Sequence, residues 1–304
     1  MRFRFGLGLS AAAAAAALAA FSVPALAEEG RAGPWQISMI DGVTSIAERM
    51  HQFNTFLTII ITLITLFVIV LLAICLIRYN HRANPTPSKT THNAVLELAW
   101  TIVPVVILVI IAIPSFRLLY AEYDMPKPDI TIRATGHQWY WNYEYEKTSP
   151  TSPQQAAAEI ASDKNADFAF DSVMLKDNEL KAGQPRLLSV DNEVVVPVGK
   201  VVRVLVTGAD VIHSFAMPAF GIKADAVPGR MQEVWFNADR EGTYYGQCSE
   251  LCGRDHAFMP IVIRVVSQQE YQNWLPGARK RFAENVPAVP AARQLADARL
   301  VPAR

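Results

Sequence analysis

Two long apolar segments, followed by many short alternating ones, divide this chain of 304 residues. Residues 55–77 carry no charge, and residues 95–113 carry only Glu97, near their start. Each segment is long enough to cross a hydrocarbon core of about 30 Å as a helix. The pattern therefore predicts a transmembrane hairpin within residues 55–120, preceded by a separate segment at 28–54.

Beyond the second apolar segment, the pattern changes to short runs rich in β-branched and aromatic residues. Runs at 130–134, 139–145, 194–196, 201–206, 234–236, 243–245 and 261–266 are separated by clusters of glycine, proline and aspartate. Regularly spaced short strands without helical patterns between them are typical of a β-sandwich or barrel. An all-β domain is therefore expected at 121–275.

Three stretches, two within this domain and one after it, lack the strand pattern. Residues 149–167 are polar and rich in alanine, which indicates a loop or a short helical insertion. Residues 268–274 are expected to form a short closing helix. Residues 276–304 repeat proline, alanine and arginine without a clear period, which predicts an extended or disordered tail.

The N-terminus and the loop between the spans set the orientation of the chain. Arg2 and Arg4 precede an alanine-rich apolar run that ends in Ala-Leu-Ala at 25–27. This pattern favours a secretory signal at 1–27, with an uncleaved anchor as the alternative. The loop at 78–89 is basic and has no acids, so the positive-inside rule places it in the cytoplasm. The β domain is then expected in the periplasm, anchored by two helices in a bacterial plasma membrane.

Composition agrees with a membrane-anchored domain. The chain is 51% hydrophobic and 18% charged, with a formal net charge of zero. Such a balance argues against a nucleic-acid partner bound through bulk positive charge. Of the three cysteines, Cys75 lies alone in the first apolar segment, where membrane packing is the expected role.

The stretch from Cys248 to Met259 contains two cysteines, one histidine and one methionine. Thiolate, imidazole and thioether together suit copper, and two thiolates can bridge two metal ions. His213 lies upstream and could complete the set. A Cys248–Cys252 disulfide and a Cys2His2 zinc site are the alternatives. However, a disulfide has no use for imidazoles, and zinc has none for a thioether.

Five motifs follow the two spans in a fixed order. They are Gly-His-Gln-Trp-Tyr-Trp-Asn-Tyr-Glu-Tyr at 136–145, Gly-Ala-Asp-Val-Ile-His-Ser at 208–214, Asp-Ala-Val-Pro-Gly-Arg at 225–230, Gly-Gln-Cys-Ser-Glu-Leu-Cys-Gly at 246–253 and His-Ala-Phe-Met-Pro at 256–260. In this order, they make residues 52–274 resemble subunit II of the haem–copper cytochrome c oxidases. The resemblance implies a two-helix transmembrane hairpin followed by a cupredoxin domain, a Greek-key β-sandwich.

The resemblance also implies a dinuclear copper centre, called CuA. Cys248 and Cys252 would bridge both coppers. The remaining ligands would be His213 and Met259 on one copper, and His256 and the main-chain carbonyl of Glu250 on the other. By position alone, Asp210 and Arg230 are expected to support these ligands.

A second metal and a proton path are implied as well. The carboxylate of Glu250 would help to bind Mg²⁺ at the boundary with subunit I, although an exposed turn carboxylate is the alternative. Glu97 would stand at the entrance of a proton path in subunit I. The alternative is an interfacial carboxylate that reaches toward the cytoplasm.

For electron entry, the resemblance assigns Trp139 as the surface indole that receives an electron from cytochrome c. Glu144, Glu146 and Asp191 are candidates for an acidic face that attracts this basic partner. Each of these residues also has an ordinary reading. The indole could simply pack in the sheet, and each acid could be a solvated surface charge.

The expected function is that of subunit II of a proton-pumping cytochrome c oxidase. It would accept electrons from cytochrome c and pass them to haem in subunit I for reduction of oxygen to water, with subunit III as a further partner. A quinol-oxidase-like scaffold without copper would lack the ligands that are present. A copper carrier would not need the hairpin, Trp139 or Glu97. No Cys-x-x-Cys-His occurs, so no fused c-type haem is expected.

Overall fold

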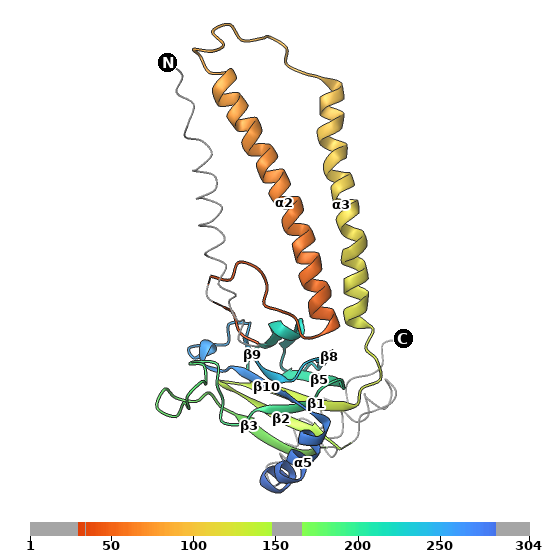
Figure 1. Cartoon of the computed structure of the whole chain (residues 1–304), viewed down its shortest axis with the longest axis vertical. Coiled ribbons are helices and arrows are strands. Elements are labelled where there is room, and N and C mark those ends of the chain that lie inside the picture. The colour runs from red at the N-terminus through yellow and green to blue at the C-terminus, as the bar shows by residue number, and fades with distance from the viewer. Residues whose placement is uncertain (1–29, 34, 148–165, 284–304) are drawn as a thin grey trace, which may run out of the picture.

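A computed structural model describes residues 30–33, 35–147 and 166–283 and shows a helical hairpin standing on a β-sandwich (Figure 1). The predicted signal at 1–27 lies outside the described residues. So do most of the insertion predicted at 149–167 and residues 284–304 of the predicted tail. The hairpin and the sandwich correspond to the two patterns in the sequence.

The hairpin consists of α2 (Ser45–Arg78) and α3 (Ala94–Tyr123). Both helices are long and apolar enough to cross a membrane. Helix α2 begins well before the apolar segment because Thr44 caps it. The Thr44 hydroxyl accepts a hydrogen bond from the Ala47 amide. Ala47 is buried against the sandwich, so this first turn belongs to the domain rather than to the membrane.

Ten strands of the described residues form two five-stranded sheets. The first sheet has the order β3 (Ala166–Ser172), β2 (Tyr140–Glu146), β1 (Ile130–His137), β5 (Val201–Gly208) and β8 (Gln232–Asn237). The second has the order β4 (Val194–Pro197), β10 (Ile261–Val266), β9 (Gly242–Cys248), β6 (His213–Met217) and β7 (Ile222–Ala226). The β1–β5 and β4–β10 pairs are parallel, and all other pairs are antiparallel. The main core lies between the sheets.

Aromatic side chains fill the core beneath one end of the sandwich. Trp141 packs edge-on against Phe215 across the two sheets, with ring centroids 5.4 Å apart. Its indole nitrogen donates a hydrogen bond to the main-chain oxygen of Met259 at 3.2 Å. This buried contact connects the core to the loop that follows β9, and so helps to fix that loop.

Three strands were not expected from the sequence. They are β3, β6 and β7. The sequence analysis placed Asp167 in the insertion, but Asp167 belongs to β3. The tail prediction is wrong for residues 276–282, because α5 (Gln268–Phe282) continues through Pro276. The ring of Phe282 packs 4.9 Å from that of Phe170, and the burial of Ala278 and Phe282 helps to offset the hydrogen bond that proline removes from a helix. In Figure 1, α5 lies on the side of the sandwich away from the hairpin.

Main-chain and side-chain hydrogen bonds fasten the hairpin to the sandwich. The Val43 amide donates to the Ala219 oxygen at 2.8 Å, next to the short helix η2 (Pro218–Phe220). The Trp235 indole nitrogen donates to the Glu122 oxygen at 2.9 Å, at the end of α3. Both helices are therefore held at the ends that meet the domain.

Candidate metal centre

The cysteines converge with one histidine at one end of the sandwich. Cys248 ends β9, His213 begins β6, and Cys252 lies in the loop between β9 and the short helix η3 (His256–Phe258). One ligand atom from each of these three residues lies within 4.8 Å of the others, and all three residues are buried. Because β6 and β9 are neighbours in the sheet, the framework itself brings His213 to the cysteines.

His213 is oriented as a metal ligand would be. Its Nε2 lies 2.8 Å from Asp210 Oδ1. Its Nδ1 is buried and has no hydrogen-bond partner among the described residues. Metal-bound histidines usually bind a carboxylate or carbonyl through the second ring nitrogen, which fixes the ring. The Asp210 contact leaves Nδ1 free for a metal, as expected for the supporting role predicted for Asp210. Arg230, the other predicted supporting residue, is exposed.

The other predicted ligands surround the same sulfurs. His256 Nδ1 and Met259 Sδ each lie 3.6 Å from Cys252 Sγ. The main-chain oxygen of Glu250 lies 3.3 Å from Cys248 Sγ. Met259 is fully buried, whereas His256 lies partly at the surface. The structure thus brings together all six groups that the sequence predicted.

The spacing of the sulfurs fits shared metal ligation. The Sγ atoms of Cys248 and Cys252 are 3.8 Å apart, and both thiols are free. Metal–thiolate bonds of about 2.3 Å, as for zinc, allow two sulfurs on one ion to be up to about 4.6 Å apart. A thioether beside two thiolates and two imidazoles also favours copper over zinc. The cluster is therefore a candidate copper site.

The acidities of the two thiols differ. Burial raises the pKa of Cys248, but interactions with the His213 imidazole and with main-chain groups of Ser214 and Glu250 outweigh it and lower the pKa to about 6. Burial and the adjacent Cys248 thiolate raise the pKa of Cys252 to about 12. Cys248 is therefore the more acidic of the two thiols. A metal bound by both sulfurs would displace the proton of Cys252.

Trp139 lies directly on the metal loop. Its indole nitrogen donates a hydrogen bond to the Cys252 main-chain oxygen at 3.2 Å, and the Arg254 guanidinium lies 5.5 Å from its ring centroid. A Cβ at Gly253 would come within 3.0 Å of this ring. Gly253 also has φ +123°, which disfavours other residues. Glycine at this position therefore allows the indole to contact the loop.

Two further positions were missed by the sequence reasoning. A Cβ at Gly136 would lie 2.8 Å from the His213 ring, so glycine there leaves room for the imidazole. The Gln138 side-chain amide donates a hydrogen bond to the Cys252 main-chain oxygen at 2.9 Å, and the Gln138 main-chain amide donates one to Asp210 at 2.7 Å. The motif at 136–145 contained both residues, but only the strand pairing reveals what they contact.

The acidic face expected at Glu144 and Glu146 is wrong. The Glu144 side chain is only 9% exposed and lies 3.9 Å from Arg133, its cross-strand neighbour. The Glu146 side chain is 4% exposed and lies 3.8 Å from Arg203. The alternation in β2 suggested exposed glutamates. However, both side chains are buried, and arginines of β1 and β5 in the same sheet pair with them.

The remaining predicted site residues lie apart from the metal cluster. Asp191 is exposed and accepts hydrogen bonds from the amides of Val173 and Asn192, both at 2.8 Å. The Glu250 carboxylate is 45% exposed and lies 3.4 Å from Lys223, pointing away from the sulfurs that its carbonyl faces.

Glu97 lies at the start of α3, at the end of the hairpin away from the sandwich. Its Oε1 accepts a hydrogen bond from the Asn93 amide at 3.2 Å. Asn93 caps the same helix in return. This reciprocal capping is a local structural role that the sequence reasoning did not assign to Glu97.

Comparison with known proteins agrees with the geometry. The family model for the periplasmic domain of cytochrome c oxidase subunit II matches residues 130–266, and the model for its transmembrane domain matches residues 32–118. A probable cytochrome c oxidase subunit 2 of Rickettsia bellii is 47% identical over 81% of this chain and 86% of the relative. The chain belongs to the cytochrome c oxidase subunit II family.

Other members extend the match. Cytochrome c oxidase subunit 2 of Cereibacter sphaeroides is 42% identical over 90% of this chain and 91% of its own length. A crystal structure of the periplasmic domain of subunit II from Bradyrhizobium japonicum is 56% identical. It covers 52% of this chain and 99% of its own, with a TM-score of 0.43. The predicted family and the predicted hairpin followed by a cupredoxin sandwich are confirmed.

Proposed function

We propose that this subunit accepts electrons from cytochrome c at a dinuclear CuA centre and passes them to haem in subunit I of a proton-pumping oxidase. One observation carries the proposal. Two thiols, two imidazoles, a thioether and a carbonyl converge on one buried cluster, while Asp210 holds the far side of His213. No simpler site, such as a disulfide or a zinc site, uses all six groups.

The protein would contribute rigidity to electron transfer. When bound, two copper ions bridged by thiolates supply a one-electron acceptor whose charge change is shared between both ions. His213 starts a paired strand, and the Met259 main chain is tied to the core through Trp141. Such supported ligands move little between oxidation states, which keeps the reorganisation small.

Trp139 offers a short path into the centre. Its indole reaches the Cys252 main-chain oxygen through one hydrogen bond of 3.2 Å, and the Cys252 sulfur is only a few covalent bonds further. The ring is partly exposed, so a partner can contact it. We therefore keep Trp139 as the entry point for an electron.

The surface around this path suggests how cytochrome c docks. With Glu144 and Glu146 buried, Asp191 remains as the predicted acid on the surface. Three apolar side chains emerge between the proposed ligands instead, and they are 48%, 82% and 43% exposed: Ile212, Leu251 and Phe258. Exposed apolar side chains around a redox centre favour close contact with a partner. Charge would then steer the encounter rather than hold the complex.

Further parts of the proposal concern the boundary with subunit I. The outward carboxylate of Glu250 would bind Mg²⁺ together with groups of subunit I, in place of its contact with Lys223. Glu97 would receive protons on the cytoplasmic side. Subunit III is the further expected partner, and a bacterial plasma membrane is the expected location.

Copper content and electron paramagnetic resonance of the full chain test the proposal. We expect two coppers per chain, and one unpaired electron shared by both nuclei in the oxidised form. Cys252→Ser should abolish the shared signal, because it removes one of the two thiolates that are proposed to hold both ions together. Stoichiometric zinc, or a spectrum of isolated single coppers in the wild-type chain, would overturn the dinuclear assignment.

A further inference from the structure

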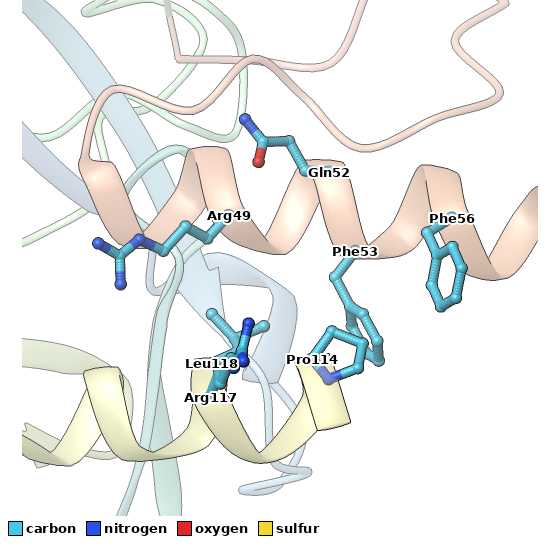
Figure 2. Close-up of a pocket in the computed structure, with 7 residues that line it drawn as sticks. All are labelled: Arg49, Gln52, Phe53, Phe56, Pro114, Arg117 and Leu118. Atoms are coloured by element: carbon cyan, nitrogen blue, oxygen red, sulfur yellow. The ribbon is translucent and has the colours of Figure 1, made fainter. Parts of the chain in front are cut away.

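A cavity of about 460 Å³ lies between α2 and α3 where the hairpin meets the sandwich. The helices converge at this end and separate toward their connecting loop (Figure 1). Figure 2 shows Phe53 of α2 pointing toward Pro114 of α3, with Arg117 and Leu118 projecting from α3 toward α2. The volume is within the range of about 300–1,000 Å³ that is usual for small-molecule sites.

The lining of the cavity changes from charged to apolar along the membrane normal. Arg49 and Arg117 lie outside the apolar segments, by about 9 Å from Thr55 and about 6 Å from Ile113 at 1.5 Å per residue. The headgroup layer on each side of a bilayer is roughly 5–8 Å thick. Arg117 is therefore at headgroup depth and Arg49 at the outer edge of the headgroup layer, while Phe56 and Pro114 lie at or below the edge of the hydrocarbon.

Both guanidinium groups are available. Among the described residues, neither Arg49 nor Arg117 forms an ion pair or a side-chain hydrogen bond, and both are exposed. The Gln52 side chain donates one hydrogen bond, to Glu48 at 3.3 Å, which leaves a second donor. Positive side chains are enriched at the cytoplasmic ends of transmembrane helices, whereas these two arginines lie at the opposite end. Their position therefore calls for a local anionic partner.

We propose that this cavity binds the headgroup of an anionic phospholipid. Its phosphate lies between Arg49 and Arg117, with Gln52 as a further donor, and one acyl chain runs over Phe53 and Pro114. Guanidinium groups bind phosphate oxygens through paired hydrogen bonds, and an anionic phospholipid combines this charge with an apolar chain at the same depths. The lipid would join the two helices where they meet the domain. This site requires only that the hairpin spans a membrane, and it is independent of the copper proposal.

The oxidase complex carrying the full chain, reconstituted in nanodiscs of phosphatidylglycerol and phosphatidylcholine, provides the test. Native mass spectrometry measures which lipid is retained. The wild-type complex should prefer phosphatidylglycerol. Arg49→Gln and Arg117→Gln should each lower that preference about fivefold, and both together about 25-fold. Arg78→Gln, at the other end of α2, is the matched control and should leave the preference unchanged.

A second double variant keeps the test decisive if the first folds poorly. Arg49→Lys with Arg117→Lys preserves both charges and should remain within about fivefold of the wild type. Recovery of the variant chain in the purified complex at the wild-type amount serves as the folding control for every variant. Undiminished phosphatidylglycerol retention in the double Gln variant would overturn the proposal, as would an equal loss in Arg78→Gln. A photo-crosslinker at Leu118 that labels another subunit instead of lipid in the wild-type complex would also overturn it.

Discussion

The hairpin and the sandwich are both rich in apolar residues. The sandwich buries them between its sheets, whereas the hairpin leaves most of them exposed on its surface. Valines of β5 such as Val202 and Val206 are fully buried between the sheets, whereas no side chain of α3 is buried. Water drives the sandwich to form its own core, while lipid solvates apolar side chains and removes that drive from the hairpin.

The same difference applies to the functional groups. In the sandwich, His213 has Asp210, and Trp139 has the Cys252 oxygen, so each side chain is positioned by this chain alone. In the hairpin, Arg49 and Arg117 have no such partner among the described residues. The comparison teaches that the sandwich contains the partners of its site, whereas lipid or other subunits must supply those of the hairpin.

The largest effect is expected on stability, when a buried charge of the sandwich is removed. Glu144→Gln removes the carboxylate charge beside the buried Arg133, and we expect the loss of this buried pair to cost more in the free energy of unfolding than the loss of an exposed pair. Asp177→Asn is the matched control, because the Asp177–Arg186 pair is more than 60% exposed on both sides and should contribute at most about 1 kcal/mol. Denaturant unfolding of the full chain measures both. Equal costs would show that Glu144 is not buried as described.

That pair also shows how far the sequence could lead. Periodicity was sufficient for the hairpin and for most strands, because these depend on residue type and local spacing. Ligand chemistry pointed to a candidate cluster of cysteine, histidine and methionine side chains, whereas the Glu250 carbonyl came only from the resemblance. The positions of Glu144 and Glu146 depend on strand register and on what covers the sheet, which alternation along one strand does not contain. Pro276 misled in the same way, since burial of the distant Phe282 decides the end of α5.

The strand β3 is a different case, because its signal was present. Asp167, Phe168, Phe170 and Asp171 show partial polar and apolar alternation next to the polar insertion. The roles of Gly136 and Gly253 carried no such signal. The ring of His213 leaves no room for a side chain at Gly136, and the ring of Trp139 lies close to Gly253. Both rings come from other parts of the chain.

A smaller effect is expected from the residue that supports a proposed ligand. Asp210→Ala removes the partner of His213 Nε2, and loss of such partners typically lowers metal affinity about 10–100-fold. Competition with a copper chelator measures the affinity of the full chain. Asp191→Ala, which removes an exposed carboxylate away from the cluster, should leave it unchanged. An unchanged affinity in Asp210→Ala would mean that strand β6 alone positions the imidazole.

Electron entry should be affected next. Trp139→Gln should lower the rate of electron transfer from cytochrome c about tenfold or more, since displacing reacting partners by about 1 Å can cost roughly 100-fold. Binding of cytochrome c and the copper spectrum should remain close to those of the wild type. Stopped-flow oxidation of cytochrome c by the oxidase complex measures the rate. A wild-type rate would mean that the indole only packs on the loop and that electrons enter elsewhere.

The smallest effect is expected in the hairpin, at Glu97, and only when the other subunits are present. Glu97 has two candidate roles, proton entry and capping of α3 through the Asn93 amide. Glu97→Gln separates them, because the amide oxygen can still accept that hydrogen bond while the side chain can no longer carry a proton. Proton-transferring groups at a reacting centre contribute about 10²–10⁴-fold, so a group at the entrance of a path should cost about tenfold or less in turnover. Oxygen consumption by the reconstituted complex measures this loss, and the copper spectrum and the stability of the chain should stay unchanged. Full turnover in Glu97→Gln, with a loss only in Glu97→Ala, would reduce Glu97 to its cap. The hairpin would then act as an anchor, with the proposed lipid bound at Arg49 and Arg117.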